Sequence, residues 1–394
     1  MNICIVSSRF YPQLVGSGTA AYVIAKELHE RGHQITVLTD ESLRGEASHA
    51  KLNFSVRYIK SLEDFAMGHA GFRDALGDLY SNIKALDPDI VHVCNFLPML
   101  LLSMIHSEVD CPVVFTFFNT PVIGSRTIGY FPDPILDTNL GSFIIKSDAY
   151  DMLILGSAHY VETARILGAH PEKLKLSYLA PDIMSFEMNT GAAIDTFFSK
   201  STQIEPYILL PSRITEQKGI IEAVEALSII NSRTGKSFKL LLTGMTSPFD
   251  PAYADIVWKK ADELGVKDHL LAPDKQIDRE NLAAFFKGAE LVVIPSWFEG
   301  LGLAAIEAQY LGAPLAVSDT TGLNEIVEDG MNGLTFKPRD SESMANAMLM
   351  ILERKVDISA MTKEAKKTVQ KFSLDKHISD IEDTYKTLVA GQQQ

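Results

Sequence analysis

Residues 291–319, LVVIPSWFEGLGLAAIEAQYLGAPLAVSD, contain the pattern that decides the fold. Residues 291–296 form a short apolar run rich in β-branched side chains, which is typical of a strand buried on both faces of a sheet. Residues 303–312 have a helical pattern, and residues 314–319 are again a short apolar run. Strand, helix and strand in this order predict a parallel βαβ unit with a right-handed crossover.

The same alternation extends over both halves of the chain. In the first half, strands are expected at 2–8, 33–40, 89–95, 112–119 and 152–157, with helices at 19–32 and near 140–150. In the second half, further strands are expected at 207–212, 238–244 and 268–272, with helices at 219–230, 252–265 and 280–289. We therefore predict an α/β protein of two Rossmann-like, doubly wound domains. Ligands bind at the carboxyl ends of the strands in such sheets, so the domains are expected to face each other across a cleft.

The boundary between the two domains is expected near residue 187, where a mixed, turn-rich stretch begins and runs to Pro206. We predict an N-terminal domain over residues 1–186, a linker over residues 187–206 and a C-terminal domain over residues 207–373. Two domains agree with a length of 394 residues, because domains of roughly 100–200 residues are the norm.

The composition disfavours several classes of partner. The chain is 46% hydrophobic and 22% charged, which is typical of a folded protein with a large core, and its net charge is −14 with neither half basic. Non-specific binding of nucleic acid and strong attachment to anionic lipid are therefore disfavoured. Peripheral contact with a membrane and the oligomeric state stay open.

Three cysteines, Cys4, Cys94 and Cys111, occur in apolar stretches without the spacing of a metal or redox motif. We expect them to be reduced, buried thiols. The N-terminus lacks the basic and apolar segments of a signal peptide, and the longest apolar run, at 96–105, is too short to span a bilayer. These features predict a cytoplasmic location.

Three loops hold candidate ligand-binding residues. The first contains Gly16 and Gly18, between the first strand and its helix, where small residues would let an anion approach the free N–H groups of the helix. A simple tight turn explains the two glycines equally well. The loop lacks the G-x-G-x-x-G pattern of dinucleotide-binding enzymes, so a dehydrogenase is disfavoured.

The second loop, residues 211–219 (PSRITEQKG), follows a predicted strand and contains Arg213 and Lys218. The planar guanidinium of Arg213 and the compact charge of Lys218 could clamp a diphosphate. The alternative is a solvated pair of surface cations.

The third loop lies inside the βαβ unit quoted above and carries Glu299, with Glu307 eight residues further on. A helix that begins near Gly302 would direct its first amides at a bound phosphate. Glu307 has apolar neighbours, among which an acid is costly unless it is hydrogen-bonded, and ribose hydroxyls would satisfy it. Glu299 could accept hydrogen bonds from the hydroxyls of a sugar. Alternatively, Glu299 complements the charge of the helix N-terminus and Glu307 lies on an exposed face.

Taken together, these motifs resemble glycosyltransferase family 4, whose members are retaining enzymes with the GT-B fold. The E-x7-E pattern at residues 299–307 and the S-R-x4-K-G pattern at residues 212–219 carry the resemblance. It extends to residues 16–39 (GSGTAAYVIAKELHERGHQITVLT), 89–95 (DIVHVCN) and 317–336 (VSDTTGLNEIVEDGMNGLTF), and covers nearly the whole chain. Residues 374–394 are similar to the family's C-terminal helix, which crosses back onto the first domain.

The resemblance implies a role for each candidate residue. Arg213 and Lys218 would hold the diphosphate of the donor, Glu299 the hydroxyls of the donor sugar, and Glu307 the hydroxyls of the ribose; Arg213, Lys218 and Glu299 would be the catalytic residues. The remaining contacts with sugar and phosphate would come from the first-domain loop and the helix start: Gly16, Gly300, Leu301, Gly302 and Leu303. The resemblance implies no metal and no cofactor, since the nucleotide-sugar is a substrate.

The acceptor side departs from the family's pattern. The corresponding strand of the family usually ends in T-x-H, whereas residues 116–120 are TFFNT and place Phe118 at the His position. Asn119 or another polar group could substitute for the His, the His could be dispensable, or the protein could transfer poorly. Phe118, Asn119 and Tyr130 are the acceptor-side candidates.

We therefore expect a retaining hexosyltransferase that moves a hexosyl unit from a nucleotide-diphosphate sugar to an acceptor hydroxyl. UDP-sugar is the expected donor, as a preference of the family. Two alternatives stay open: a nucleotide-sugar-binding protein with little transfer activity, and a phosphorylase or epimerase of the GT-B type.

Overall fold

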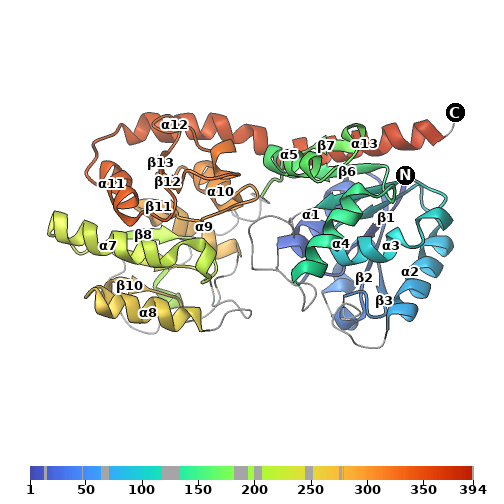
Figure 1. The fold of residues 1–394 in the computed structure, drawn as a ribbon, viewed down its shortest axis with the longest axis horizontal. Coiled ribbons are helices and arrows are strands. Elements are labelled where there is room, and N and C mark those ends of the chain that lie inside the picture. The colour runs from blue at the N-terminus through green and yellow to red at the C-terminus, as the bar shows by residue number, and fades with distance from the viewer. Residues whose placement is uncertain are drawn as a thin grey trace. The chain divides into compact units, whose positions relative to one another are not determined.

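The computed structural model describes residues 1–12, 16–46, 48–63, 71–117, 134–181, 194–198, 206–244, 252–274, 277 and 279–392. The chain divides into two compact units, each built on its own parallel sheet (Figure 1). Unit 1 consists of Met1–Tyr178 together with Asp375–Gln394, and unit 2 is Leu179–Leu374. The predicted fold class, two doubly wound α/β domains, is confirmed.

The sheet of unit 1 has the strand order β3-β2-β1-β4-β5-β6-β7. Its strands are β1 (Asn2–Val6), β2 (Gln34–Asp40), β3 (Ser55–Ile59), β4 (Ile90–Val93), β5 (Val113–Phe117), β6 (Met152–Leu155) and β7 (Leu174–Leu176). Its helices are α1 (Gly16–Glu30), α2 (Phe72–Leu86), α3 (Phe96–Ser103), α4 (Pro134–Lys146), α5 (Ala158–Ile166) and α13 (Leu374–Gln392). The direction of winding reverses between the neighbours β1 and β4.

The strands of unit 1 that the sequence predicted are the inner ones, whose residues are almost all buried. The two edge strands, β3 and β7, were not predicted because they are partly exposed and carry no continuous apolar run. The buried helix α3 was not predicted either. It contains Pro98 in its first turn, where a proline is tolerated because the N–H groups there have no partner within the helix.

The sheet of unit 2 has the strand order β10-β9-β8-β11-β12-β13. Its strands are β8 (Tyr207–Leu210), β9 (Lys239–Leu242), β10 (Leu270–Leu271), β11 (Leu291–Ile294), β12 (Leu315–Ser318) and β13 (Leu334–Phe336). Its helices are α7 (Ile220–Thr234), α8 (Tyr253–Glu263), α9 (Arg279–Gly288), α10 (Leu303–Leu311), α11 (Ser341–Leu352) and α12 (Ile358–Thr368). The winding reverses between β8 and β11, which pair in parallel with Leu291 opposite Ile208.

A buried apolar cluster holds the centre of this sheet in place. Side chains of alternate strand residues pack against α7, α8 and α11. Helix α7 is in contact with both of the other helices (Figure 1). The cluster includes Ile208, Leu210, Leu227, Leu240, Leu242, Val257, Val293 and Met348. Because both β8 and β11 contribute to it, the loops that follow these two strands begin from rigid positions.

The unit boundary differs from the predicted one by a few residues. Unit 2 begins at Leu179, whereas we predicted that the first domain extends to residue 186. The last strand of the first sheet, β7, already ends at Leu176, so the chain leaves that sheet earlier than its composition indicated. Most of the predicted linker, residues 187–206, lies outside the described residues.

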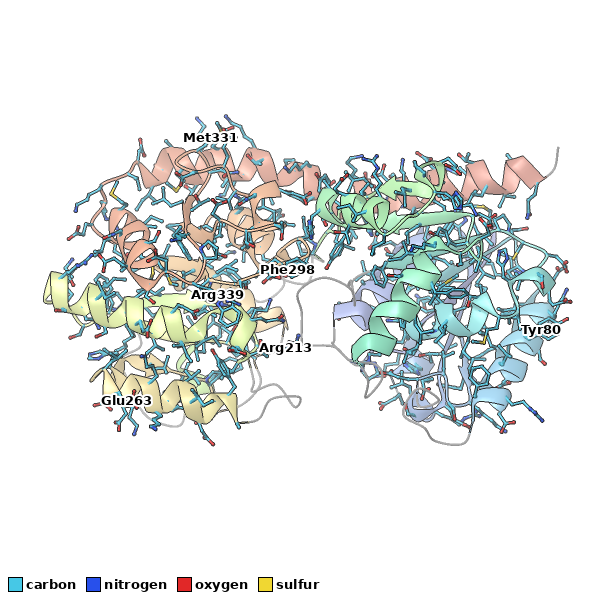
Figure 2. The ribbon with its side chains drawn as sticks, viewed as in Figure 1. Tyr80, Arg213, Glu263, Phe298, Met331 and Arg339 are labelled. Atoms are coloured by element: carbon cyan, nitrogen blue, oxygen red, sulfur yellow. The ribbon has the colours of Figure 1, made fainter. Side chains whose placement is uncertain are left out.

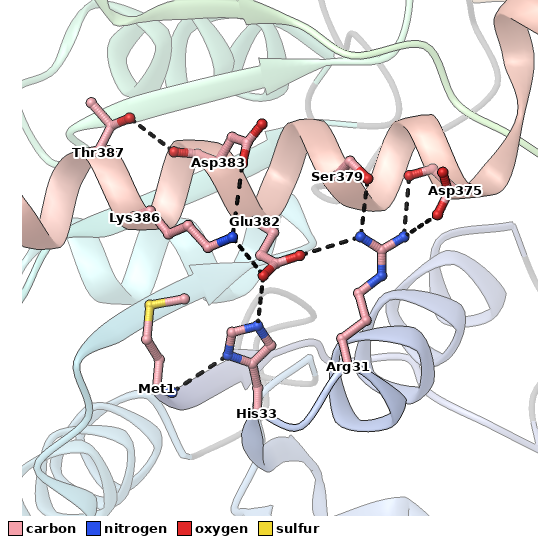
Figure 3. Close-up of polar contacts among 9 residues, drawn as sticks. All are labelled: Met1, Arg31, His33, Asp375, Ser379, Glu382, Asp383, Lys386 and Thr387. Atoms are coloured by element: carbon pink, nitrogen blue, oxygen red, sulfur yellow. Dashed lines mark hydrogen bonds and ion pairs between the residues drawn. The ribbon is translucent and has the colours of Figure 1, made fainter.

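The C-terminal helix α13 belongs to unit 1 and is attached to it by a network of charges (Figure 3). Arg31, just after α1, contacts Asp375 at 2.6 Å and Glu382 at 3.2 Å. His33 contacts the same Glu382 carboxylate at 3.4 Å, and Lys386 contacts it at 2.8 Å. Hydrogen bonds from Lys386 and then Arg31 lower the pKa of Glu382 to about 2.

Two buried histidines also connect α13 to the sheet of unit 1. His92 of β4 is hydrogen-bonded to the hydroxyl of Tyr385 at 2.5 Å and to that of Thr116 at 2.6 Å. His377 of α13 is hydrogen-bonded to the hydroxyl of Ser177 at 2.8 Å. Burial lowers the pKa of His92 to about 3 and that of His377 to about 4. Both imidazoles are therefore neutral near pH 7.

Candidate active site

The candidate site lies in unit 2, at the point where the winding of its sheet reverses. β8 and β11 are neighbours there, and the strands that follow each of them lie on opposite sides. In open α/β sheets, ligands bind outside the carboxyl ends of the strands at such a point. The loop 211–219 follows β8 and the loop 295–302 follows β11, so the topology brings two of the predicted loops to one place.

Backbone contacts join these two loops directly. The backbone N–H of Trp297 donates to the carbonyl oxygen of Gln217 at 2.9 Å. Gly219 has the left-handed φ of 65°, and a Cβ there would lie 2.1 Å from the carbonyl oxygen of Pro295. A side chain at position 219 is therefore incompatible with the observed approach of the loops.

Lys218 and Glu299 meet at the centre of the site. The Lys218 Nζ lies 2.5 Å from the Glu299 Oε1, and each side chain is only 17% exposed. The Ser296 hydroxyl donates to the same Oε1 at 2.7 Å, and Ser296 itself is buried. The alternative of a solvated surface pair does not hold for Lys218, because its ammonium is paired and largely covered. Arg213, three residues beyond β8, is exposed (Figure 2).

Helix α10 supplies the second half of the site. Gly302 is its N-cap residue with a φ of 93° and caps no amide by a side chain; the Ala305 N–H is bonded to the Gly302 carbonyl oxygen, so the preceding amides, of Leu303 and Ala304, are the ones suited to an anion. Gly322 approaches from the loop after β12, where a Cβ would lie 2.5 Å from the carbonyl oxygen of Glu299. The loop after β12 thus packs closely against the backbone at Glu299, just before the start of α10.

Glu307 is buried within α10, with an exposed fraction of 6%. The alternative of an exposed face is therefore wrong for this residue. Its neighbours Ala305, Ile306 and Ala308 are also buried. A carboxylate in this position has a high cost of desolvation, which hydrogen-bonding partners must offset.

The other predicted residues fall in unit 1 or outside the described residues. Gly16 is the first residue of α1, which follows β1. In the same unit, Ser7 after β1 donates to the Asn95 side-chain oxygen after β4 at 2.5 Å, at the reversal point of the first sheet. Phe118, Asn119 and Tyr130 lie outside the described residues.

Sequence reasoning missed three residues that shape the site. Ser296 holds Glu299, Trp297 bonds to the Lys218 loop, and Glu222 accepts a hydrogen bond from the Trp297 indole at 2.9 Å. Ser296 ends a predicted strand at the carboxyl edge, which was an available signal. Nothing local to Glu222, which lies 75 positions from Trp297, indicated its role.

Two features are absent from the described residues. They contain no group of three or more His, Cys, Asp or Glu side chains placed to hold a metal ion. Nor does any helix in the described ranges have the length and apolar character needed to cross a membrane.

We expect Gly219→Ala to destabilise unit 2 by about 2–4 kcal/mol, because it combines overpacking with left-handed strain. The fluorescence of Trp258 and Trp297, both in unit 2, measures its unfolding in urea. Gly235→Ala is the matched control: Gly235 has nearly the same φ, 63°, and no heavy atom of the described residues lies within 4 Å of where its Cβ would be. Equal losses in the two variants would contradict the close approach of Gly219 to Pro295.

Comparison with known proteins agrees with this geometry. Residues 194–368 match the family described as glycosyl transferases group 1, and residues 15–174 match glycosyltransferase family 4. An uncharacterised glycosyltransferase of Methanocaldococcus jannaschii is 24% identical over 401 residues, which cover 98% of this chain and 98% of that protein.

Solved structures share the whole fold. Sucrose-phosphate synthase from Thermosynechococcus elongatus has a TM-score of 0.81 at 19% identity, covering 99% of this chain and 100% of that one. The Anabaena protein HepE, in a complex with UDP and glucose, has a TM-score of 0.77 at 16% identity, covering 98% and 100%. With both family matches and these structures, the chain belongs to the glycosyltransferases of family 4 and has the GT-B fold.

Proposed function

We propose that this glycosyltransferase moves a hexosyl unit from a UDP-sugar to an acceptor hydroxyl, with retention at the anomeric carbon. The observation that carries the proposal is the cluster of Lys218, Glu299 and Ser296 beside the start of α10, at the reversal point of the second sheet. A cation, a carboxylate and free helix amides within one site are suited to a substrate that has both a diphosphate and sugar hydroxyls. The choice of UDP is supported by HepE, which was solved with UDP and glucose.

In the proposed reaction, the bond between the anomeric carbon and the diphosphate oxygen breaks as the acceptor oxygen bonds to the same face of that carbon. The acceptor's proton passes to the departing phosphate. Negative charge develops on the diphosphate, and Lys218, Arg213 and the amides of α10 would stabilise it. Lys218 is held by Glu299 and the amides belong to a helix, so both need little reorganisation, which is usually the largest source of such stabilisation in enzymes.

The ion pair between Lys218 and Glu299 is compatible with binding of a donor. A diphosphate near Lys218 would give its ammonium a second anionic partner. Glu299 would then have capacity to accept hydrogen bonds from sugar hydroxyls, while Ser296 continues to orient it. In this proposal the pair positions both side chains for the donor.

We further propose that transfer needs neither a metal nor a cofactor, because the cations of the site supply the compensating charge. A cytoplasmic location is also part of the proposal. It is supported by Cys4, Cys94 and Cys111, which are all free thiols; burial raises the pKa of each, that of Cys111 to about 12. Thiols of high pKa are poor nucleophiles and suit a reduced, structural state.

The test is a thermal-shift panel of UDP, GDP and ADP and their common sugars, followed by transfer assays with and without EDTA. We expect UDP and one UDP-sugar to raise the unfolding midpoint, since a ligand at about 100 times its Kd stabilises by about 2.7 kcal/mol. Binding without transfer or slow hydrolysis would favour a nucleotide-sugar-binding protein. A rate that requires inorganic phosphate would favour a phosphorylase.

We expect Glu307→Ala to weaken nucleotide binding by about 1–3 kcal/mol, because the ribose hydroxyls would lose their acceptor in a buried site. Isothermal titration with the nucleotide chosen by the panel measures this. Glu307→Gln keeps an acceptor oxygen and should lose less. Unchanged affinity in Glu307→Ala would contradict the assignment of Glu307 to the ribose.

A further inference from the structure

Trp297 contacts several segments of unit 2 that are far apart in the sequence. Its backbone N–H donates to the carbonyl oxygen of Gln217, and its carbonyl oxygen accepts from the Thr320 hydroxyl at 3.0 Å. Its indole N–H donates to Glu222 of α7 at 2.9 Å. The Arg339 guanidinium carbon lies 3.8 Å from the centre of its ring. Trp297 therefore contacts the loop after β8, the loop after β12, helix α7 and the loop after β13.

These contacts bear directly on the pair of Lys218 and Glu299. Gln217 is the residue immediately before Lys218, and Trp297 is two residues before Glu299. The hydrogen bond between Trp297 and Gln217 thus sets the relative position of the two backbone segments that carry the pair. A shift of the indole would move both partners relative to the start of α10.

Arg339 has a backbone conformation that is unfavourable for a residue with a side chain. Its φ is 59°, in the left-handed region that glycine adopts at much lower cost. Its guanidinium lies over the Trp297 ring at a distance typical of a cation–π contact. Glu222 accepts the indole N–H at the edge of the same side chain, although the other Glu222 oxygen is buried with no hydrogen-bond partner in the described part of the chain. Arg339 thus has backbone strain and Glu222 a buried oxygen without a hydrogen bond, and both side chains contact the indole.

We propose that Arg339 is a positioning residue for glycosyl transfer: stacked on Trp297, it holds the 295–302 loop so that Lys218 and Glu299 are placed for the donor. Arg339 does not touch the donor in this proposal, and it acts only through Trp297. The proposal rests on the proposed function for its effect on turnover. Its effect on the loop is independent of any ligand.

The test compares Arg339→Gly with Arg354→Gly. Arg354 also has a left-handed φ, 55°, and lies between α11 and α12 in the same unit. Both changes remove an exposed arginine and relieve the same backbone strain, and both add the same chain entropy to the unfolded state, so the unfolding midpoint should change by similar, small amounts. Only Arg339→Gly removes the stack on Trp297.

In the ligand-free protein, we expect Arg339→Gly to accelerate amide hydrogen exchange at residues 215–219 and 296–302, with no such change in Arg354→Gly. In transfer assays, kcat should fall about tenfold in Arg339→Gly, with less change in the donor KM, because a small misplacement of catalytic groups is costly. Arg339→Lys, which keeps the charge but loses the planar stack, should be intermediate.

Equal amide exchange and equal kcat in the two glycine variants would overturn the proposal. A fall in kcat that is explained by a lower unfolding midpoint of Arg339→Gly would overturn it as well. A wild-type protein that binds no nucleotide-sugar would instead overturn the proposed function. In that case the exchange experiment still decides whether Arg339 holds the loop.

Discussion

Lys218→Ala is expected to lower kcat for glycosyl transfer by about a hundredfold to a thousandfold, as the loss of one group that stabilises developing negative charge does in other enzymes. Lys218 is the covered cation of the site, paired with Glu299 at 2.5 Å. Initial rates at saturating donor measure the effect. Lys259→Ala, which removes a lysine that is 79% exposed on α8 of the same unit, is the control and should retain full activity.

A second variant separates the two roles that Lys218 could have. If Lys218 served only to orient Glu299, its removal should have little further effect once Glu299 is changed to Gln. If Lys218 contacts the diphosphate, Lys218→Ala should still lower kcat strongly in the Glu299→Gln background. A double-mutant cycle of these variants gives the coupling between the side chains directly. Full activity in the single variant Lys218→Ala would rule out its role in transfer.

Acidification below pH 6.5 is expected to release α13 from unit 1. His92 and His377 have an ordinary pKa near 6.5 in the unfolded chain, and burial lowers these values to about 3 and about 4 in the folded protein. Between these limits the unfolded state binds more protons than the folded state, so stability falls as the pH falls. Each histidine contributes at most about 1.4 kcal/mol per pH unit, and the two together about 3 kcal/mol between pH 6.5 and pH 5, because the unfolded imidazoles are already half protonated at pH 6.5.

Glu382 of α13 responds over a different pH range from the histidines. The pKa of Glu382 is lowered to about 2 in the folded protein, so the stability that it contributes is lost only below its ordinary value of 4.5. His33 contacts Glu382, and burial lowers the pKa of this histidine as well, so a loss of attachment between pH 6.5 and pH 5 reports His33 together with His92 and His377. Amide exchange of α13 and β4, corrected for the intrinsic effect of pH, measures it.

Single substitutions identify the histidine that is responsible. His92→Gln and His377→Gln should each reduce the slope of stability against pH, because each removes one titrating group. His170→Gln is the control, since that imidazole is 47% exposed. An unchanged slope in both buried-site variants would show that other groups cause the acid sensitivity.

Local pattern was enough to find most elements of the two sheets. The continuous apolar runs at β1, β4, β8, β11 and β12 were visible because a strand covered on both faces needs apolar residues at successive positions. The edge strands β3 and β7 were not predicted, because a partly exposed strand can contain polar residues and then has no continuous apolar run. The candidate residues Glu299 and Glu307 were visible for the opposite reason: acids in an apolar stretch are costly and call for an explanation.

Pairing between distant residues could not be deduced in this way. Lys218 and Glu299 are 81 positions apart, and they meet because β8 and β11 are neighbours in the sheet. Local pattern specifies that each residue follows a strand, but strand order depends on packing across the whole unit. The same packing buries Glu307, brings Arg339 over Trp297, and orients Glu299 through Ser296.

The amino-acid order alone thus specified two doubly wound domains and the loops that hold the candidate residues, since hydrophobic periodicity and turn residues act over a few positions. The arrangement of those loops into one site came from the folded chain. Burial and hydrogen bonding act between residues that are near in space, and only the completed sheet of unit 2 places Lys218, Glu299 and Trp297 together.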